Sequence, residues 1–197
     1  MTAKQFTGRP GSKLSKQFGA SLGVLLMLML ITVPAEAKRA KVSQILNNNG
    51  FQTLLFALDT TGLTSVLDEN QVALFAPTDD VFDATANSLG CVDALELATN
   101  LLNTPVGDTN ALTVVLTYHA YLGSLNSNRR LLSAGEIQMA SGGTVVTGVG
   151  QNGLYVMGDA NATPSVITAQ FDTRNNSSVY AIDQILLPID PAGICGS

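Results

Sequence analysis

Histidine and cysteine are nearly absent from the 197-residue chain, which contains only His119, Cys91 and Cys195. A structural zinc site needs four nitrogen or sulfur ligands, so three such residues are too few. A serine or cysteine hydrolase of the usual type would have to use His119 as its base. The position of His119 beside Tyr118, after a buried helical stripe, instead predicts a hydrogen-bonded residue of the core or of a junction between elements.

Basic residues are also scarce, and four of the ten precede an apolar run at 22–33. Ala35-Glu36-Ala37 follows as a cleavage motif, so residues 1–37 are predicted to be a signal peptide that is removed after Ala37. The alternative is a retained membrane anchor, for which the run is short. Cleavage would leave residues 38–197, enough for one packed core, as a single secreted domain that is extracellular, periplasmic or attached to the cell surface.

The predicted mature chain is acidic, with six basic and fourteen acidic residues and a net charge of −8. It lacks the basic footprint that a phosphate backbone requires, so we expect no nucleic-acid partner. Arg129 and Arg130 are interpreted as an exposed loop pair rather than a recognition site.

Export gives Cys91 and Cys195 an oxidising environment in which they can pair. Such a disulfide would fix the carboxyl-terminal tail to the middle of the domain. The alternative is two separate thiols, because sequence does not show whether their α-carbons approach within bridging range.

Apolar spacing predicts helices mainly in the first half of the mature chain and strands mainly in the second. The predicted helices lie at 51–61, at 63–67, from 79 onward, at 91–103 and from 108 or 109 to the helix-to-strand junction at 118–123. The predicted strands lie at 72–76, 144–147, 154–157, 165–171 and 179–187. This order favours an α+β fold over alternating β/α units.

The segment that follows the strand at 72–76 carries Asp79, Asp80 and Asp83, which allow two interpretations. If Pro77 ends the strand and Thr78 is an N-cap, Asp79 and Asp80 complement the free amides of a first helical turn. A hard-cation loop would need further ligands nearby, and the segment has none. We therefore expect a strand-to-helix connection rather than a metal or acid-base site.

Two other patterns are weak signals. Gly148–Gly153 fits the dinucleotide fingerprint G-x-G-x-x-G, but Leu154 begins a β-prone segment where the fingerprint requires a helix. We predict a β-hairpin there and no cofactor. Asn161, Asn175 and Asn176 fit the N-x-[ST] glycosylation pattern, whose use depends on the host.

Three segments, ALFAPTDDVFDA at 73–84, LTYH at 116–119 and VYAIDQILLP at 179–188, resemble the signatures of fasciclin domains in order and spacing. The resemblance covers about residues 42–188. One position departs from the family, because Asn176-Ser177 stands where members commonly carry Asn-Gly. This departure bears only on the geometry of the local turn, since serine tolerates a positive φ less well than glycine.

The resemblance implies an α+β domain, a wedge-shaped β-sandwich of about seven strands with helices packed along one edge. It also implies that the family's motif residues have structural roles. The corresponding residues here are Phe75, Pro77, Thr78, Asp79, Tyr118, His119, Asp183 and Pro188.

Fasciclin domains are secreted or surface-attached adhesion modules without a known catalytic centre. The resemblance therefore implies a non-enzymatic protein without cofactor or metal. Its expected partner is a cell-surface or matrix protein or polysaccharide. No membrane span is expected after signal cleavage. A short acidic motif associated with integrin binding in animal members has no counterpart here, so no integrin site is expected. The alternative function is a carrier of an apolar small molecule such as a carotenoid, which some members bind.

Overall fold

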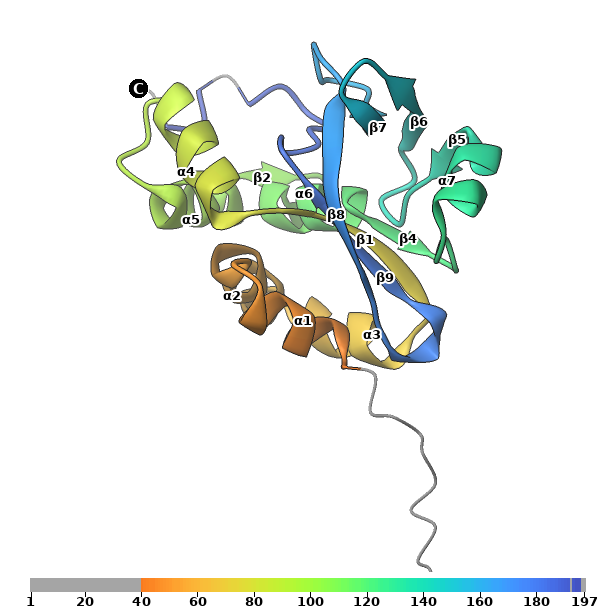
Figure 1. Cartoon of the computed structure of the whole chain (residues 1–197). Coiled ribbons are helices and arrows are strands. Elements are labelled where there is room, and N and C mark those ends of the chain that lie inside the picture. Colours follow the sequence, from red (N-terminus) through yellow and green to blue (C-terminus); the bar gives the residue numbers. More distant parts are fainter. Residues whose placement is uncertain (1–39, 192, 196–197) are drawn as a thin grey trace, which may run out of the picture. The chain divides into compact units, whose positions relative to one another are not determined.

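The computed structural model describes residues 40–191 and 193–195, so the predicted leader at 1–37 lies outside the described residues. Figure 1 shows the arrangement of the elements. The helices are α1 (Val42–Asn48), α2 (Gln52–Thr60), α3 (Leu63–Glu69), α4 (Asp79–Ser88), α5 (Ala94–Asn103), α6 (Ala111–Tyr118), α7 (Asn128–Ala134) and the 3-10 turn η1 (Arg174–Asn176). The strands are β1 (Val72–Pro77), β2 (Pro105–Val106), β3 (Thr109–Asn110), β4 (Ala120–Leu122), β5 (Glu136–Gln138), β6 (Thr144–Gly150), β7 (Gly153–Gly158), β8 (Ser165–Asp172) and β9 (Ser178–Ile182).

Seven strands form one mixed sheet in the order β4-β1-β9-β8-β7-β6-β5, and β2 and β3 form a separate small hairpin. The neighbouring strands β1 and β9 run parallel, with Phe75 opposite Tyr180. All other neighbours in the sheet are antiparallel. The α+β class and the number of strands expected from the sequence are therefore confirmed.

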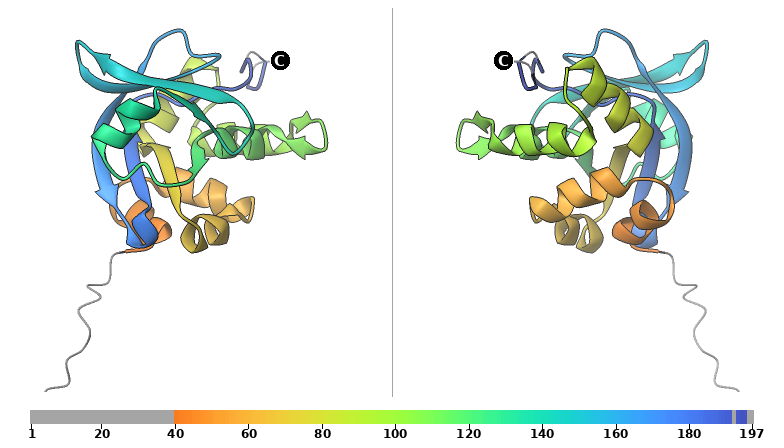
Figure 2. Two further views of the ribbon diagram at one scale, coloured as in Figure 1. Left: turned by 90° about the vertical axis from the view of Figure 1, so that its right-hand side faces the viewer. Right: turned by 90° about the vertical axis from the view of Figure 1, so that its left-hand side faces the viewer.

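Strands β1 and β9 have a packed core on each face, because side chains alternate along a strand. Leu74 and Ala76 of β1 pack into a core shared with helices α1 to α6. Phe75 points the other way, into a second core that also contains residues of β5, β6 and β7. There its ring stacks on that of Tyr180, with 5.6 Å between the ring centroids. Figures 1 and 2 show helices α1 to α6 on one side of β1 and β9, and the β5–β7 strands with α7 on the other.

The edge strand β4 is covered by the turn between β5 and β6. Because the Phe75 N–H donates to the carbonyl of His119, the next carbonyl, that of Ala120, points away from β1. There it accepts a hydrogen bond from the Ala140 N–H (2.8 Å). The two ends of the seven-stranded order therefore meet, and the sheet is nearly closed.

Some predicted boundaries are wrong. The helix expected from 108 or 109 begins at Ala111, because residues 105–110 form the β2–β3 hairpin and the Asn110 side chain caps the helix by accepting from the Thr113 N–H (2.8 Å). Two short helices, α1 and α7, and the three-residue strand β5 were not predicted. Gly148–Gly153 belongs to the β6–β7 hairpin, as predicted, with Gly150 opposite Gly153.

The last strand ends at Ile182 instead of continuing to 187. The Asp183 N–H still donates to the Val166 carbonyl of β8 (3.2 Å), but from here on side chains provide most of the partners of the backbone. The Asp183 carboxylate accepts from the Val166 N–H (2.6 Å), and the Gln184 N–H donates to the Ser165 hydroxyl (3.0 Å). The chain leaves the sheet here because these side chains replace the strand partners that the apolar pattern at 179–187 suggested.

Candidate functional site

Asp79 joins the start of α4 to the start of α2. Its carboxylate accepts hydrogen bonds from the Thr53 N–H (2.7 Å) and the Gln52 N–H (3.0 Å), the first amides of α2. Its own N–H donates to the Gly50 carbonyl (3.1 Å). Thr78 occupies the N-cap position of α4, as the sequence suggested, but its side chain makes no capping bond. Asp79 therefore caps a different helix from the one it belongs to, and its oxygens are occupied by backbone amides.

Replacing Asp79 with alanine should lower the free energy of unfolding by about 1–3 kcal/mol, because two amides of α2 lose a charged acceptor. Asp80 is a matched control, since it is adjacent and exposed. Asp80→Ala should change stability by less than about 0.5 kcal/mol. Urea denaturation of both variants measures the difference, and equal losses would contradict the assigned role of Asp79.

Tyr118 is a buried connection between α6 and the β6–β7 strands. Its hydroxyl donates to the Thr144 carbonyl (2.6 Å) and accepts from the Asp159 N–H (2.9 Å). Its ring lies so close to Gly158 that a β-carbon there would come within 2.9 Å of it. Burial raises the pKa of the Tyr118 phenol, so the hydroxyl stays protonated and keeps donating.

His119 is buried, with 1% of its surface exposed. Its Nε2 accepts a hydrogen bond from the Leu186 N–H (3.0 Å), so the ring proton is on Nδ1, which donates to the Val115 carbonyl (2.7 Å). Burial lowers the pKa of His119 to about 4, because the charged ring would lose its hydration. The imidazole thus holds the last turn of α6 to the segment after β9, in its neutral form.

The lowered pKa of His119 makes stability depend on pH. In the unfolded chain the ring binds a proton near pH 6.5, whereas in the folded protein it does so only near pH 4. The unfolded state therefore binds more protons in this interval, and the stabilisation present above pH 6.5 is lost as the pH falls. We expect a loss of about 3 kcal/mol between pH 6.5 and 4.

The pH effect is measured by urea denaturation between pH 7 and 5, where carboxylates contribute least. His119→Gln removes the titrating ring, so this variant should show a flatter profile. Wild-type and variant profiles of the same slope would contradict the assignment.

The segment that contains Asp183 and Pro188 is held by Asn161, a residue that sequence reasoning considered only for glycosylation. The Asn161 amide donates to the Ile185 carbonyl (2.8 Å) and accepts from the Leu187 N–H (3.0 Å). An asparagine whose partners lie more than twenty positions away gives no local sequence signal.

The predicted site residues do not form one open site. Asp79 bonds to α2 and His119 is enclosed, whereas Asp80 and Asp183 line an open depression that contains neither of them. His119 borders an apolar cavity between α4, α5, α6 and the tail, whose volume is about 20 Å³, the size of a single water. Within residues 40–191 and 193–195, no group of three or more His, Cys, Asp or Glu could hold a metal ion.

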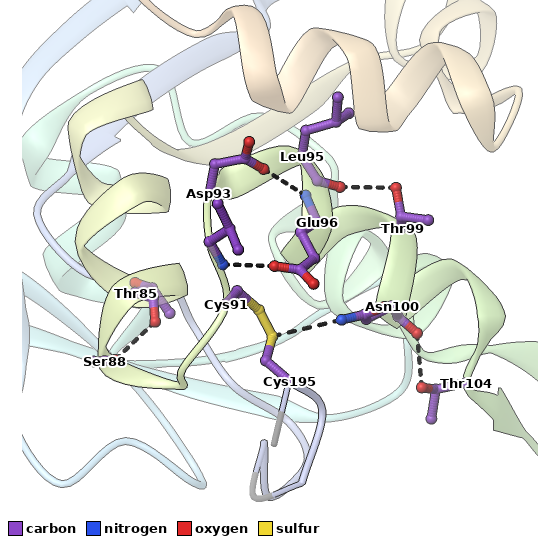
Figure 3. Close-up of a disulfide and its surroundings, with 11 residues drawn as sticks. Thr85, Ser88, Cys91, Asp93, Leu95, Glu96, Thr99, Asn100, Thr104 and Cys195 are labelled. Carbon is purple, nitrogen blue, oxygen red and sulfur yellow. Dashed lines mark hydrogen bonds between the residues drawn. A yellow bond between two sulfur atoms is a disulfide. The ribbon is translucent and has the colours of Figure 1, made fainter. Parts of the chain in front are cut away.

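A disulfide joins Cys91, just before α5, to Cys195 in the tail, with 5.0 Å between their α-carbons (Figure 3). The Asn100 side chain of α5 reaches the Cys195 sulfur (3.8 Å). Nearby, Asp93 caps α5 by accepting from the Glu96 N–H (2.8 Å). The sequence left open whether the cysteines pair, and the structure has them paired.

The model of the family described as Fasciclin domain matches residues 49–188 of the chain. The chain belongs to the fasciclin domain family. Among solved structures, a FAS1 domain pair from the insect cell adhesion molecule fasciclin I is similar, with a TM-score of 0.50 and 13% sequence identity. The match covers 71% of this chain and 46% of that one, so this chain spans less than half of the pair, and at this identity the likeness shows the fold alone. No curated protein matches the sequence.

Fasciclin domains are associated with cell adhesion, are generally not enzymes and are typically extracellular or at the cell surface. In the part of the chain that the structure describes, no helix is long and apolar enough to cross a membrane.

The departure from the fasciclin pattern at Asn176-Ser177 is accommodated by the preceding asparagines. Asn175 and Asn176 take the positive φ angles, 62° and 57°, whereas Ser177 is extended. The buried Ser177 hydroxyl accepts from the Val72 N–H (2.9 Å) and donates to the Asn70 carbonyl (3.2 Å). Ser177 thus fastens the start of β1 to the turn before β9, a connection that glycine could not make.

Proposed function

We propose that the mature protein is a secreted, non-enzymatic module that binds cell-surface or matrix components. The observation that carries this proposal is that the polar groups of the fasciclin motif, those of Asp79, Tyr118 and His119, are bonded to the protein's own backbone. Groups engaged in this way build the scaffold, and recognition is left to the outer surface. The association of fasciclin domains with adhesion supports the same proposal.

The contact made by one such domain is expected to be weak and to become effective through multivalent display. A carrier of a carotenoid is less well supported. The apolar cavity beside His119 has a volume of about 20 Å³, whereas sites for small organic ligands usually occupy about 300–1,000 Å³.

The proposal is tested by retention of the full chain, produced in an exporting host, on cells and on surfaces coated with matrix proteins or polysaccharides. We expect saturable retention that is lost when the protein is thermally unfolded. The absence of retention on every surface, at every concentration, would overturn the proposal. A turnover activity that His119→Gln abolishes without unfolding the protein would overturn its non-enzymatic part.

We also propose that residues 1–37 are removed on export. Mass spectrometry of the exported protein should then give the mass of a chain that begins at Lys38, lowered by two protons because of the disulfide. A mass that includes residues 1–37 would show a retained leader.

A further inference from the structure

An open depression beside α7 is lined by polar side chains alone. The lining residues are Asn126, Ser127, Asn128, Arg129, Arg130 and Gln170. They come from the β4–α7 connection, from α7 and from β8, segments that are distant in the sequence. The depression has a volume of about 640 Å³ and is open to solvent rather than enclosed.

The backbone beneath this depression is fixed by the core. Leu125 and Leu131 are buried on either side of the lining residues, and the Leu125 carbonyl accepts a hydrogen bond from the buried Tyr180 hydroxyl. The Ser124 hydroxyl donates to the Asn176 carbonyl (3.0 Å) and accepts from the Arg130 guanidinium (3.4 Å). A ligand would therefore meet a surface that is already formed, which lowers the entropy cost of binding.

The depression carries positive charge on an otherwise acidic domain. Arg129 and Arg130 are exposed, and the single ion pair of the described residues joins Lys41 to Asp68, so neither arginine has a carboxylate partner there. No acidic residue lines the depression. The nearby Asp172 carboxylate is not part of the lining, but it accepts a hydrogen bond from the Gln170 amide (3.0 Å). By contrast, the open depression beside α4 contains Asp80 and Asp183, and the one beside α3 contains three acidic residues.

This lining suits an anionic carbohydrate. Guanidinium groups bind carboxylate and sulfate with paired hydrogen bonds, and the amide and hydroxyl side chains can bond to sugar hydroxyls. Single-stranded nucleic acid would require aromatic side chains for base stacking, and none lines the depression. An extended anionic membrane would also face the acidic remainder of the domain, whereas a single polymer strand can contact the depression alone.

We propose that the depression formed by residues 126–130 and Gln170 binds a strand of acidic polysaccharide through its carboxylate or sulfate groups. This inference rests on the proposed adhesive function and names the class of its partner. Arg129 and Arg130 supply the charge recognition, and Asn126, Asn128 and Gln170 position the sugar.

The test measures equilibrium binding of the full exported chain to polygalacturonate and to dextran sulfate at low salt, with neutral dextran as the control polymer. The double variant Arg129→Gln/Arg130→Gln should bind the acidic polymers at least roughly tenfold more weakly, because two charge-assisted contacts are lost. A matched double variant, Lys41→Gln/Arg174→Gln, removes the same charge elsewhere and should bind within about threefold of the wild type. Thermal unfolding verifies that both variants are folded.

Three outcomes would overturn the inference: no binding of either acidic polymer, equal weakening in the two double variants, or tighter binding to phosphatidylserine vesicles than to polysaccharide. If the wild type and Arg129→Gln/Arg130→Gln adhere equally well to cells or matrix, the inference fails while the adhesive function stands. If the wild type is retained on no surface at all, both fail.

Discussion

Replacing His119 with alanine is expected to lower the free energy of unfolding by about 3–5 kcal/mol. The substitution leaves the buried Leu186 N–H without its acceptor, and the Val115 carbonyl keeps only its bond from the backbone N–H of residue 119. It also removes a ring that is 1% exposed, beside a cavity that already exists, so the void would grow. Urea denaturation at pH 7 measures this loss, which would be a large fraction of the stability of an ordinary domain.

His119→Gln is the informative control for this effect. The glutamine side-chain oxygen can still accept from the Leu186 N–H, so this variant should lose less stability than His119→Ala. A stability of His119→Ala within about 1 kcal/mol of the wild type would show that the histidine is not an essential connection.

Removal of the disulfide is the second change with a large expected effect. The bond between Cys91 and Cys195 closes a sequence separation of 104 residues. Restricting the unfolded chain over a loop of this length stabilises a protein by about 4–5 kcal/mol in the chain-entropy model. Urea denaturation of Cys91→Ser/Cys195→Ser should show a loss of this order.

The released tail should also become accessible. Ile189 and Ile194 pack against the helical core in the disulfide-bonded structure. In the double serine variant, limited proteolysis should remove the tail first, while the region of β1 and β9 remains protected. Wild-type protein treated with a reductant offers a control without substitution. An unchanged denaturation midpoint in both samples would contradict the stabilising role of the disulfide.

Sequence periodicity was sufficient where an element buries a regular face. The spacing of Phe51, Leu54 and Leu58 predicted α2, and these side chains are indeed buried. The apolar run at 72–76 predicted β1, which is buried along its whole length. In both cases burial against the core decides the structure, and burial is what the apolar pattern records.

Periodicity failed where side chains distant in the sequence satisfy the backbone. Val179–Leu187 has the apolar pattern of one long strand, yet His119 and Asn161 take the backbone amides of Leu186 and Leu187. The helix α7 has one buried residue, Leu131, and therefore too little periodicity to detect.

In the candidate site too, the local sequence indicated the roles of residues but not their distant partners. The structural character of Asp79 and His119 could be inferred from their neighbours, because a carboxylate at a helix start and a lone histidine after an apolar helix have ordinary structural uses. Their partners could not be inferred, since Asp79 bonds to a helix that precedes it by more than twenty residues. The depression beside α7 was not predicted either. Arg129 and Arg130 were interpreted as a loop pair, but they lie in the helix α7, and Gln170 comes to them from β8, a strand distant in the sequence.

The hydrogen bond between Ala140 and Ala120 has a consequence for behaviour at high concentration. An unpaired strand edge is the usual template on which β-rich proteins polymerise. Here the edge strand β4 has an outward carbonyl bonded from within the same chain, and both edge strands, β4 and β5, are only three residues long. The folded domain should therefore resist fibril growth by strand addition, and crowding at a surface can increase its avidity without leading to aggregation.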